Sequence, residues 1–247
     1  MIEEGAFLRP DWAAAANVDA WFTTRVGGAS EGPYASMNLG LHVGDDAAHV
    51  QENRRRALIG TDARPVWLNQ VHGIQVADLD AGEPTGAADA AVTSRTDVVC
   101  SVLVADCLPV FFCDAAGARV GVAHAGWRGL RAGVLEATVA AMRVPPSTLL
   151  VHLGPAIGPQ AFEVGEDVRA AFCDRHSGAA SSFVARPDMP GKFLADLPAL
   201  ARMRLRDAGV LRVSGGSYCT FTDAAKFFSY RRDGVTGRMG ALIRLRG

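Results

Sequence analysis

Three apolar runs follow one another closely between Val98 and Leu130, and they constrain the fold more than any other feature of the chain. The segment reads VVCSVLVADCLPVFFCDAAGARVGVAHAGWRGL, and short runs rich in Val and Phe are typical of buried strands. We therefore predict strand, turn, strand, turn, strand, and then a helix that opens with Gly-Trp-Arg-Gly. Asp106 and Cys107 fall in the first turn, and His124 falls at the end of the third strand.

Further strands and a few helices are predicted along the rest of the chain. Asp46 can cap a helix that runs through His49 to Ile59, and Asp196 can cap one that runs to Ala208. Helical spacing of apolar residues also follows Gly126 and covers residues 163–174. Short apolar runs predict strands near residues 21–25, 66–69, 74–79, 149–153 and 241–245. Strands thus outnumber helices without regular alternation, which indicates a layered α+β domain rather than a doubly wound nucleotide-binding sheet.

Charge and cysteine content exclude several classes of protein. The 25 Lys and Arg residues nearly cancel the 26 Asp and Glu residues, so nothing favours binding to nucleic acid or to an anionic membrane. The longest apolar run, residues 98–105, is far shorter than the ~20 residues that span a bilayer. Five cysteines without a CxxC pair indicate a reduced chain, and the first residues lack a signal-peptide pattern. We expect one cytoplasmic domain, residues 1–247. The sequence leaves the oligomeric state open, with a monomer as one option.

A possible metal site is formed by His72, Cys107 and His124, which all lie at predicted strand ends. Two imidazoles and one thiolate can bind zinc tetrahedrally with one position open, as in catalytic zinc sites. Such an ion lowers the pKa of bound water to ~7. The sequence separations of 35 and 17 residues match no recognised zinc spacing, however. On residue type alone, a buried structural cysteine and a Cys107–His124 nucleophile pair remain open.

Several groups are candidates for contact with an anionic or aromatic ligand. The segment from Gly126 to Gly129 can present backbone N–H groups and the Arg128 side chain to phosphate, or it can be a plain tight turn. Arg25 and residues 231–232 add further cations. The aromatic segment 226–230 is predicted first as a packed strand, with a wall for nucleobase stacking as the alternative.

Eight short motifs occur in one order along nearly the whole chain. They are Thr23–Gly28 with Ser30, Met37–Gly40, Val43–Asp45, Asn69–Gly73, Ala105–Pro109, His124–Gly129, Leu153–Ile157 and Phe227–Arg232. In these motifs the chain resembles the laccase-domain family, whose members are described as multicopper polyphenol oxidase-like proteins and as purine nucleoside phosphorylases. No motif position departs from the family pattern.

The resemblance implies a fold, a metal site and an activity. The implied fold is a layered α/β/β/α sandwich with two largely antiparallel sheets and outer helices. The implied metal ligands are His72, Cys107 and His124, and the implied ion is zinc. The implied activities are phosphorolysis of adenosine, inosine, guanosine and methylthioadenosine, and deamination of adenosine. Purine nucleosides and phosphate are thus the expected small-molecule partners.

Secondary roles follow as hypotheses from the chemistry of the neighbouring residues. Arg25 is the first choice for holding phosphate and Arg128 the second. Asn38 is expected to bind the sugar. Asp106 is expected to act as a general acid or base, or to orient a metal-binding histidine, and Glu163 is a weaker acid–base candidate.

Three other functions are alternatives to a zinc enzyme that acts on nucleosides. Multicopper oxidases need about ten histidine ligands, whereas this chain has six histidines, so copper would have to use the zinc site. A metal-free cysteine hydrolase using Cys107 and His124, acting on peptidoglycan precursors, is the second alternative. A non-enzymatic scaffold is the third, but it would not need Cys, His, Asp and Arg gathered at strand ends.

Overall fold

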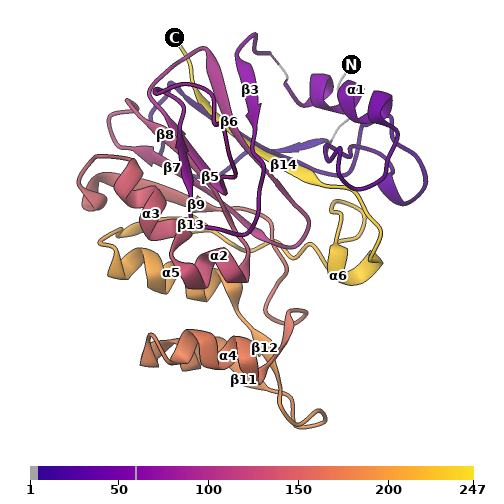
Figure 1. Ribbon diagram of the computed structural model, residues 1–247, viewed down its shortest axis with the longest axis vertical. Helices are drawn as coiled ribbons and strands as arrows, with labels where there is room; N and C mark the ends of the chain where they lie inside the picture. The colour runs from indigo at the N-terminus through magenta and orange to yellow at the C-terminus, as the bar shows by residue number, and fades with distance from the viewer. Residues whose placement is uncertain (1–4, 59) are drawn as a thin grey trace.

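Two large β-sheets pack face to face in the computed structural model, which describes residues 5–58 and 60–247 (Figure 1). One sheet has the order β1-β2-β14-β6-β3 and the other the order β13-β9-β7-β8-β5-β4. Most neighbouring strands are antiparallel, and the β3–β6, β4–β5 and β9–β13 pairs are parallel. The first sheet comprises β1 (Phe7–Leu8), β2 (Val18–Thr23), β3 (Arg64–Trp67), β6 (Val98–Val104) and β14 (Met239–Leu245). The second comprises β4 (Val76–Asp78), β5 (Ala90–Thr93), β7 (Leu108–Asp114), β8 (Val120–Ala125), β9 (Leu149–Leu153) and β13 (Arg212–Gly215).

Alternating side chains along the central strands fill the two faces of each sheet. In β7, Phe111 and Cys113 point into the layer between the sheets, whereas Val110 and Phe112 point to the helices. In β14, Ile243 faces the other sheet and Leu242 faces outward. Successive residues of a strand project to opposite faces, and these strands are apolar at most positions because both faces are covered.

Helices cover the outer faces of both sheets, so the predicted α/β/β/α layering is confirmed. α2 (Trp127–Ala132), α3 (Val134–Ala141) and α5 (Leu197–Asp207) share one hydrophobic cluster with the six-stranded sheet. α1 (Ala47–Ala57) lies over the five-stranded sheet, where the Trp21 indole N–H donates to the Ala57 carbonyl at 2.9 Å. As predicted, the Asp46 and Asp196 side chains cap α1 and α5. The predicted end of the first helix at Ile59 lies outside the described residues.

A third, small sheet lies below the main layers and was not predicted (Figure 1). It has the order β10-β12-β11, with β10 at Glu163–Gly165, β11 at Phe183–Ala185 and β12 at Lys192–Ala195. α4 (Glu166–Cys173) packs on this sheet, so the helix predicted for 163–174 begins three residues later. Three short 3-10 turns, Gly32–Tyr34, Pro146–Thr148 and Ser177–Ser182, complete the described elements together with α6 (Tyr230–Asp233).

Two local predictions need correction. The helical segment after Gly126 is two helices, because Gly133 between them adopts a left-handed conformation with φ of 116°. The aromatic segment 226–230 is not a strand, although Phe227 and Phe228 are fully buried as expected of packed residues. The Arg232 guanidinium donates to the carbonyls of residues 220, 221 and 227. These carbonyls therefore have hydrogen-bond partners without pairing to a neighbouring strand.

No helix in the described part of the chain is both long and apolar enough to cross a membrane.

Candidate metal centre and its surroundings

Three candidate metal ligands converge at one end of the two large sheets. His72 follows β3, Cys107 lies in the turn between β6 and β7, and His124 lies near the end of β8. Their ligand atoms all lie within 4.8 Å of one another, and the Cys107 Sγ is 3.7 Å from the His72 Nε2. Ligand pairs around tetrahedral zinc are about 3.3–3.8 Å apart, given the usual bond lengths. Small side-chain shifts would therefore let all three bind one ion.

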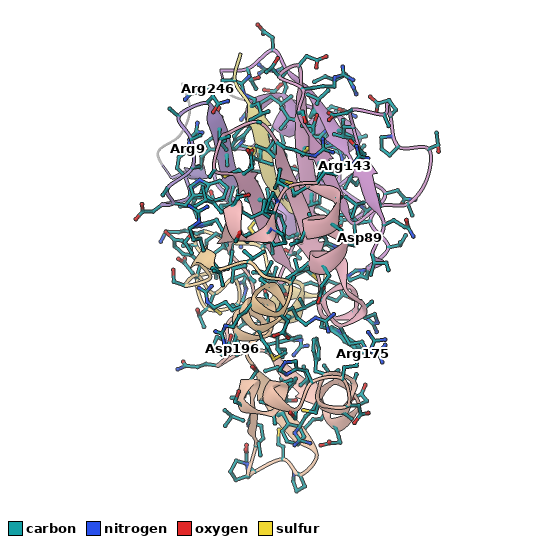
Figure 2. All side chains as sticks on the ribbon, turned by 90° about the vertical axis from the view of Figure 1, so that its left-hand side faces the viewer. Arg9, Asp89, Arg143, Arg175, Asp196 and Arg246 are labelled. Carbon is teal, nitrogen blue, oxygen red and sulfur yellow. The ribbon has the colours of Figure 1, made fainter. Side chains whose placement is uncertain are left out.

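The Asp89 carboxylate, which sequence reasoning missed, connects both histidines. Asp89 is fully buried just before β5, and Figure 2 labels it beside the lower end of the sheets. Its Oδ1 lies 2.8 Å from the His124 Nδ1 and accepts the His72 backbone N–H at 2.9 Å. Its Oδ2 accepts the N–H groups of Val71 and Gly73 at 3.1 and 2.7 Å. This carboxylate thus fixes the turn that carries His72 and leaves the His124 Nε2 for a metal.

These hydrogen bonds decide the charge of Asp89. Burial raises the pKa of the carboxyl, but hydrogen bonds from His124 and from the Gly73 and Val71 amides outweigh it, so the pKa lies below its ordinary value. An ionised Asp89 favours the His124 tautomer that carries its proton on Nδ1. His72 itself adopts a φ of 61°, a conformation that few residues other than glycine adopt without support.

The thiol of Cys107 and the imidazole of His124 shift each other's pKa. Burial raises the pKa of Cys107, but the neighbouring His124 and His72 lower it by more, so the net shift is downward. Burial lowers the pKa of His124, but the Cys107 thiolate and Asp89 raise it, so the net shift is upward. The site therefore favours a thiolate, which is the form of cysteine that binds metals and the form that attacks electrophiles.

Gly126, the residue before α2, leaves the space in which the ligands meet. A Cβ at this position would lie 2.7 Å from the His72 Cδ2 and 2.9 Å from the Cys107 Sγ. Its φ of −61° suits any residue, so backbone strain does not explain the glycine. A glycine is needed here because any side chain would collide with the candidate metal ligands His72 and Cys107.

We expect Gly126→Ala to weaken zinc binding about 10–100-fold, as for changes that displace ligands without removing them. The measurement is competition with a chromogenic chelator. Gly86→Ala is the matched control, because a Cβ there has no atom within 4 Å and should leave zinc affinity unchanged. Equal affinities for both variants would show that the ligands do not meet beside Gly126.

Asp106 holds the turn that carries Cys107 and does not contact a histidine. Its Oδ1 accepts the Thr220 hydroxyl at 2.6 Å, and its Oδ2 accepts the Arg231 backbone N–H at 2.7 Å. The Asp106 backbone, with a φ of 85°, also accepts the N–H of Ile157. Asp106 was expected to orient a metal-binding histidine, but the carboxylate that contacts one is Asp89. Asp106 instead attaches the Cys107 turn to the C-terminal loops.

Asn38, the expected sugar contact, has its side chain fully occupied within the protein. The Nδ2 donates to the Asp45 carboxylate at 2.9 Å and to the Gly40 carbonyl at 3.3 Å. The Oδ1 accepts the N–H groups of Gly40 and Arg238 at 2.9 and 2.8 Å. An amide makes about four hydrogen bonds, so none remains for a ribose. Asn38 instead fixes the 38–45 loop against the start of β14.

The arginines predicted to hold phosphate differ in how far their donors are used. The Arg25 Nε and Nη1 donate to the carbonyls of residues 35 and 224, and its guanidinium lies 4.8 Å from the Phe228 ring centre. Arg128 is exposed and stacks on Trp127 at 4.6 Å. Arg231 donates to the Glu163 carbonyl. Glu163, the weaker acid–base candidate, lies on the small sheet, where its carboxylate is 3.1 Å from the Arg186 guanidinium.

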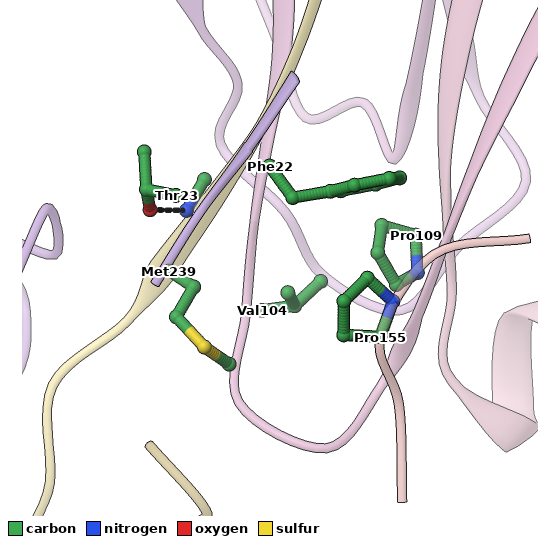
Figure 3. A pocket seen from close by; sticks show the side chains of 7 residues that line it. Phe22, Thr23, Val104, Pro109, Pro155 and Met239 are labelled. Carbon is green, nitrogen blue, oxygen red and sulfur yellow. Dashed lines mark hydrogen bonds between the residues drawn. The ribbon is translucent and has the colours of Figure 1, made fainter. Parts of the chain in front are cut away.

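An apolar crevice lies behind the Cys107 turn (Figure 3). Val104 and Pro109 flank the turn, and the Thr23 hydroxyl accepts the Gly240 N–H at 2.8 Å beside them. The remaining lining residues are Phe22, Pro155 and Met239. The crevice has no room for a water molecule, so it supports the turn from behind and is not a substrate pocket.

Comparison with known proteins identifies the family. The family described as "Multi-copper polyphenol oxidoreductase laccase" matches residues 19–246. The chain belongs to this family. It is 53% identical to a protein of Pseudomonas aeruginosa named purine nucleoside phosphorylase, over 96% of this chain and 98% of that protein. It is 50% identical to an Escherichia coli protein of the same name, over 95% and 96%.

Solved structures of relatives have the same fold. The chain superposes on the crystal structure of a Neisseria meningitidis protein with a TM-score of 0.94 and 51% identity, covering 98% of this chain and all of that one. A Bacillus licheniformis protein gives 0.87 at 32% identity, covering 93% of each chain. The predicted α+β class is thus confirmed by the structure of the chain and by its relatives.

The family description mentions several copper ions, but the described residues assemble a single small ligand group. Within residues 5–58 and 60–247, His72, Cys107 and His124 form the one set of three or more His, Cys, Asp or Glu side chains placed to hold an ion. A multicopper centre needs many more histidine ligands. The donor set present suits one tetrahedral metal ion.

Proposed function

We propose that this chain is a zinc-dependent enzyme that cleaves adenosine, inosine, guanosine and methylthioadenosine with phosphate and deaminates adenosine to inosine. The observation that carries the proposal is the near full-length identity of about one half to proteins named purine nucleoside phosphorylase. The assembly of His72, Cys107 and His124 supports it independently, because three side chains that could hold a metal ion meet at the strand ends.

The residues present fit zinc. One thiolate and two imidazoles are a donor set that zinc prefers, and three protein ligands leave a coordination position open. Gly126 supplies the space, and Asp89 sets the tautomer of His124. When bound, zinc would supply a Lewis acid that works at neutral pH.

In the proposed phosphorolysis, a phosphate oxygen bonds to C1′ of the ribose while the bond from C1′ to the purine nitrogen breaks. The purine leaves with the bonding electron pair and gains a proton. In the proposed deamination, water adds at C6 of adenosine and ammonia leaves. Asp89 and Asp106 act as positioning residues, because every carboxylate oxygen already accepts hydrogen bonds that hold His72, His124 or the Cys107 turn.

The test is chromatography of the products formed from inosine and from adenosine by zinc-loaded and zinc-stripped protein. We expect hypoxanthine and ribose 1-phosphate from inosine only when phosphate is present, inosine from adenosine, and recovery of both activities on adding back zinc. Full activity in the stripped protein would contradict the proposal.

One observation favours a second candidate function. Cys107 is favoured as a thiolate beside His124, as in thiol hydrolases. Such an enzyme, including one that edits peptidoglycan precursors, would survive chelation and be inactivated by an alkylating agent. The zinc enzyme would lose activity on chelation, so the two agents separate the candidates. Phenol oxidation in copper-free buffer tests the copper alternative in the same way.

A further inference from the structure

Arg238 lies beside the turn that carries Cys107, and the sequence did not single it out. We propose that the Arg238 guanidinium binds the phosphate co-substrate, or another tetrahedral oxyanion that takes its place. This assignment rests on the proposed phosphorolysis. It replaces Arg25 and Arg128 in that role.

Strand pairing brings the backbone of Arg238 close to the turn that carries Cys107. β14 and β6 are antiparallel, with Met239 opposite Val104 at the last pair of the ladder. Arg238 directly precedes β14, and the Cys107 turn directly follows β6, so both leave the sheet at the same edge. Cys107 also packs against the buried cluster of Val104, Phe227, Phe228 and Met239, which confirms that the start of β14 adjoins the thiol.

The Arg238 side chain is held in place but retains free donors. Its Nη1 donates to the Thr236 and Gly237 carbonyls at 2.9 and 3.1 Å, and its guanidinium lies 5.8 Å from the Tyr230 ring centre. Its backbone N–H donates to Asn38, so the occupied amide of Asn38 fixes this residue. Among the described residues, Nε and Nη2 have no hydrogen-bond partner. Two free N–H groups on a rigid guanidinium match two oxygens of a phosphate.

The charges around Arg238 agree with this position. Burial lowers the pKa of its guanidinium by more than the Cys107 thiolate and the Asp106 carboxylate raise it, so the net shift is downward. An arginine remains charged even when half-buried, so it can attract an anion to a site that already contains negative side chains.

The other arginines near the site are less suited to the role. Arg25 uses Nε and Nη1 on backbone carbonyls, and Arg232 uses both terminal nitrogens on the carbonyls of residues 220, 221 and 227. Arg231 extends to the Glu163 carbonyl and the Phe162 ring on the small-sheet unit. Arg128 has no side-chain hydrogen bond to any residue that the structure describes, and its exposed side chain stacks on Trp127. Arg238 combines fixed position, partial burial and unused donors.

The test compares Arg238→Gln with wild-type protein, both loaded with zinc. We expect the KM for phosphate to rise about 10–100-fold, because the charge-assisted hydrogen bonds to the anion are lost. Zinc content, and the Kd of inosine measured without phosphate, should stay within about twofold, because the anion contact affects neither. Arg238→Lys keeps the charge without the planar fork and should fall between the two. A purely structural role would change zinc content or inosine binding together with the phosphate KM.

Calorimetric titration with inorganic phosphate tests the site without turnover. Wild-type protein should bind phosphate, and Arg238→Gln should bind it at least about tenfold more weakly. Arg25→Gln and Arg128→Gln test the rival arginines, and Arg143→Gln, an exposed cation paired with Asp78, is the matched control. Unchanged phosphate binding in Arg238→Gln, or a larger loss in either rival, would overturn the assignment. A wild type that binds phosphate yet cleaves no nucleoside would instead refute the proposed function.

Discussion

Cys107→Ala is expected to lose zinc completely, with content falling from about one ion per chain to near zero at micromolar protein, because two ligands rarely retain zinc against buffer. Purine release from inosine should fall to background with it. The physical reason is that Cys107 supplies the only negative charge among the three ligands, and its thiolate is already favoured by the two histidines. Elemental analysis and product chromatography on the same preparation measure both quantities.

Cys173→Ala is the matched control for this prediction. Cys173 is also partly buried, but it ends α4 in the small-sheet unit, so its removal should alter neither zinc nor activity. Melting temperatures show whether each variant is folded. Retention of stoichiometric zinc by folded Cys107→Ala would exclude Cys107 as a ligand.

Asp89→Asn is expected to weaken zinc binding about 10–100-fold and to destabilise the fold by about 1–3 kcal/mol. Asp89 accepts hydrogen bonds from three successive backbone N–H groups and from His124. An asparagine of the same shape would turn an NH₂ group toward some of these donors, and the His124 tautomer would lose its charged partner. Chelator competition gives the affinity, and denaturant unfolding gives the stability.

Asp114→Asn separates the two effects. Asp114 is also buried and also accepts three backbone N–H groups, from residues 116, 118 and 119, but it ends β7 away from the Cys107 turn. It should lower stability to a similar degree and leave zinc affinity unchanged. If both variants lost zinc affinity equally, Asp89 would have no special role toward the metal ligands.

The central part of the fold could be predicted because local sequence determines it. The apolar runs of residues 98–104, 108–114 and 120–125 become β6, β7 and β8, since only buried strands of that length suit them. The small sheet could not be predicted in this way. Its strands have three or four residues and mixed burial, so they depend on pairing with each other rather than on their own pattern. Phe227 and Phe228 were predicted to be buried but not to lie in a loop held by Arg232.

The candidate site shows the same limit. His72, Cys107 and His124 lie far apart in sequence, so spacing alone did not join them, and their grouping came from the family resemblance and then from the geometry. Asp89 was missed because its partners lie 16 to 35 residues away. A signal was present, however: an acidic residue stands directly before the apolar run of residues 90–93. The amide of Asn38 and the free donors of Arg238 could be recognised only once the 38–45 loop and β14 were seen together.

Anomalous X-ray scattering from crystals of wild-type protein, purified and grown without added metal, tests the central claim most directly. Data collected on both sides of the zinc absorption edge should give one strong peak per chain. That peak should lie between the Cys107 Sγ and the Nε2 atoms of His72 and His124, at about 2.0–2.3 Å from each. A full-occupancy peak elsewhere in the molecule, or its absence from crystals of protein that cleaves inosine at full rate, would contradict the account.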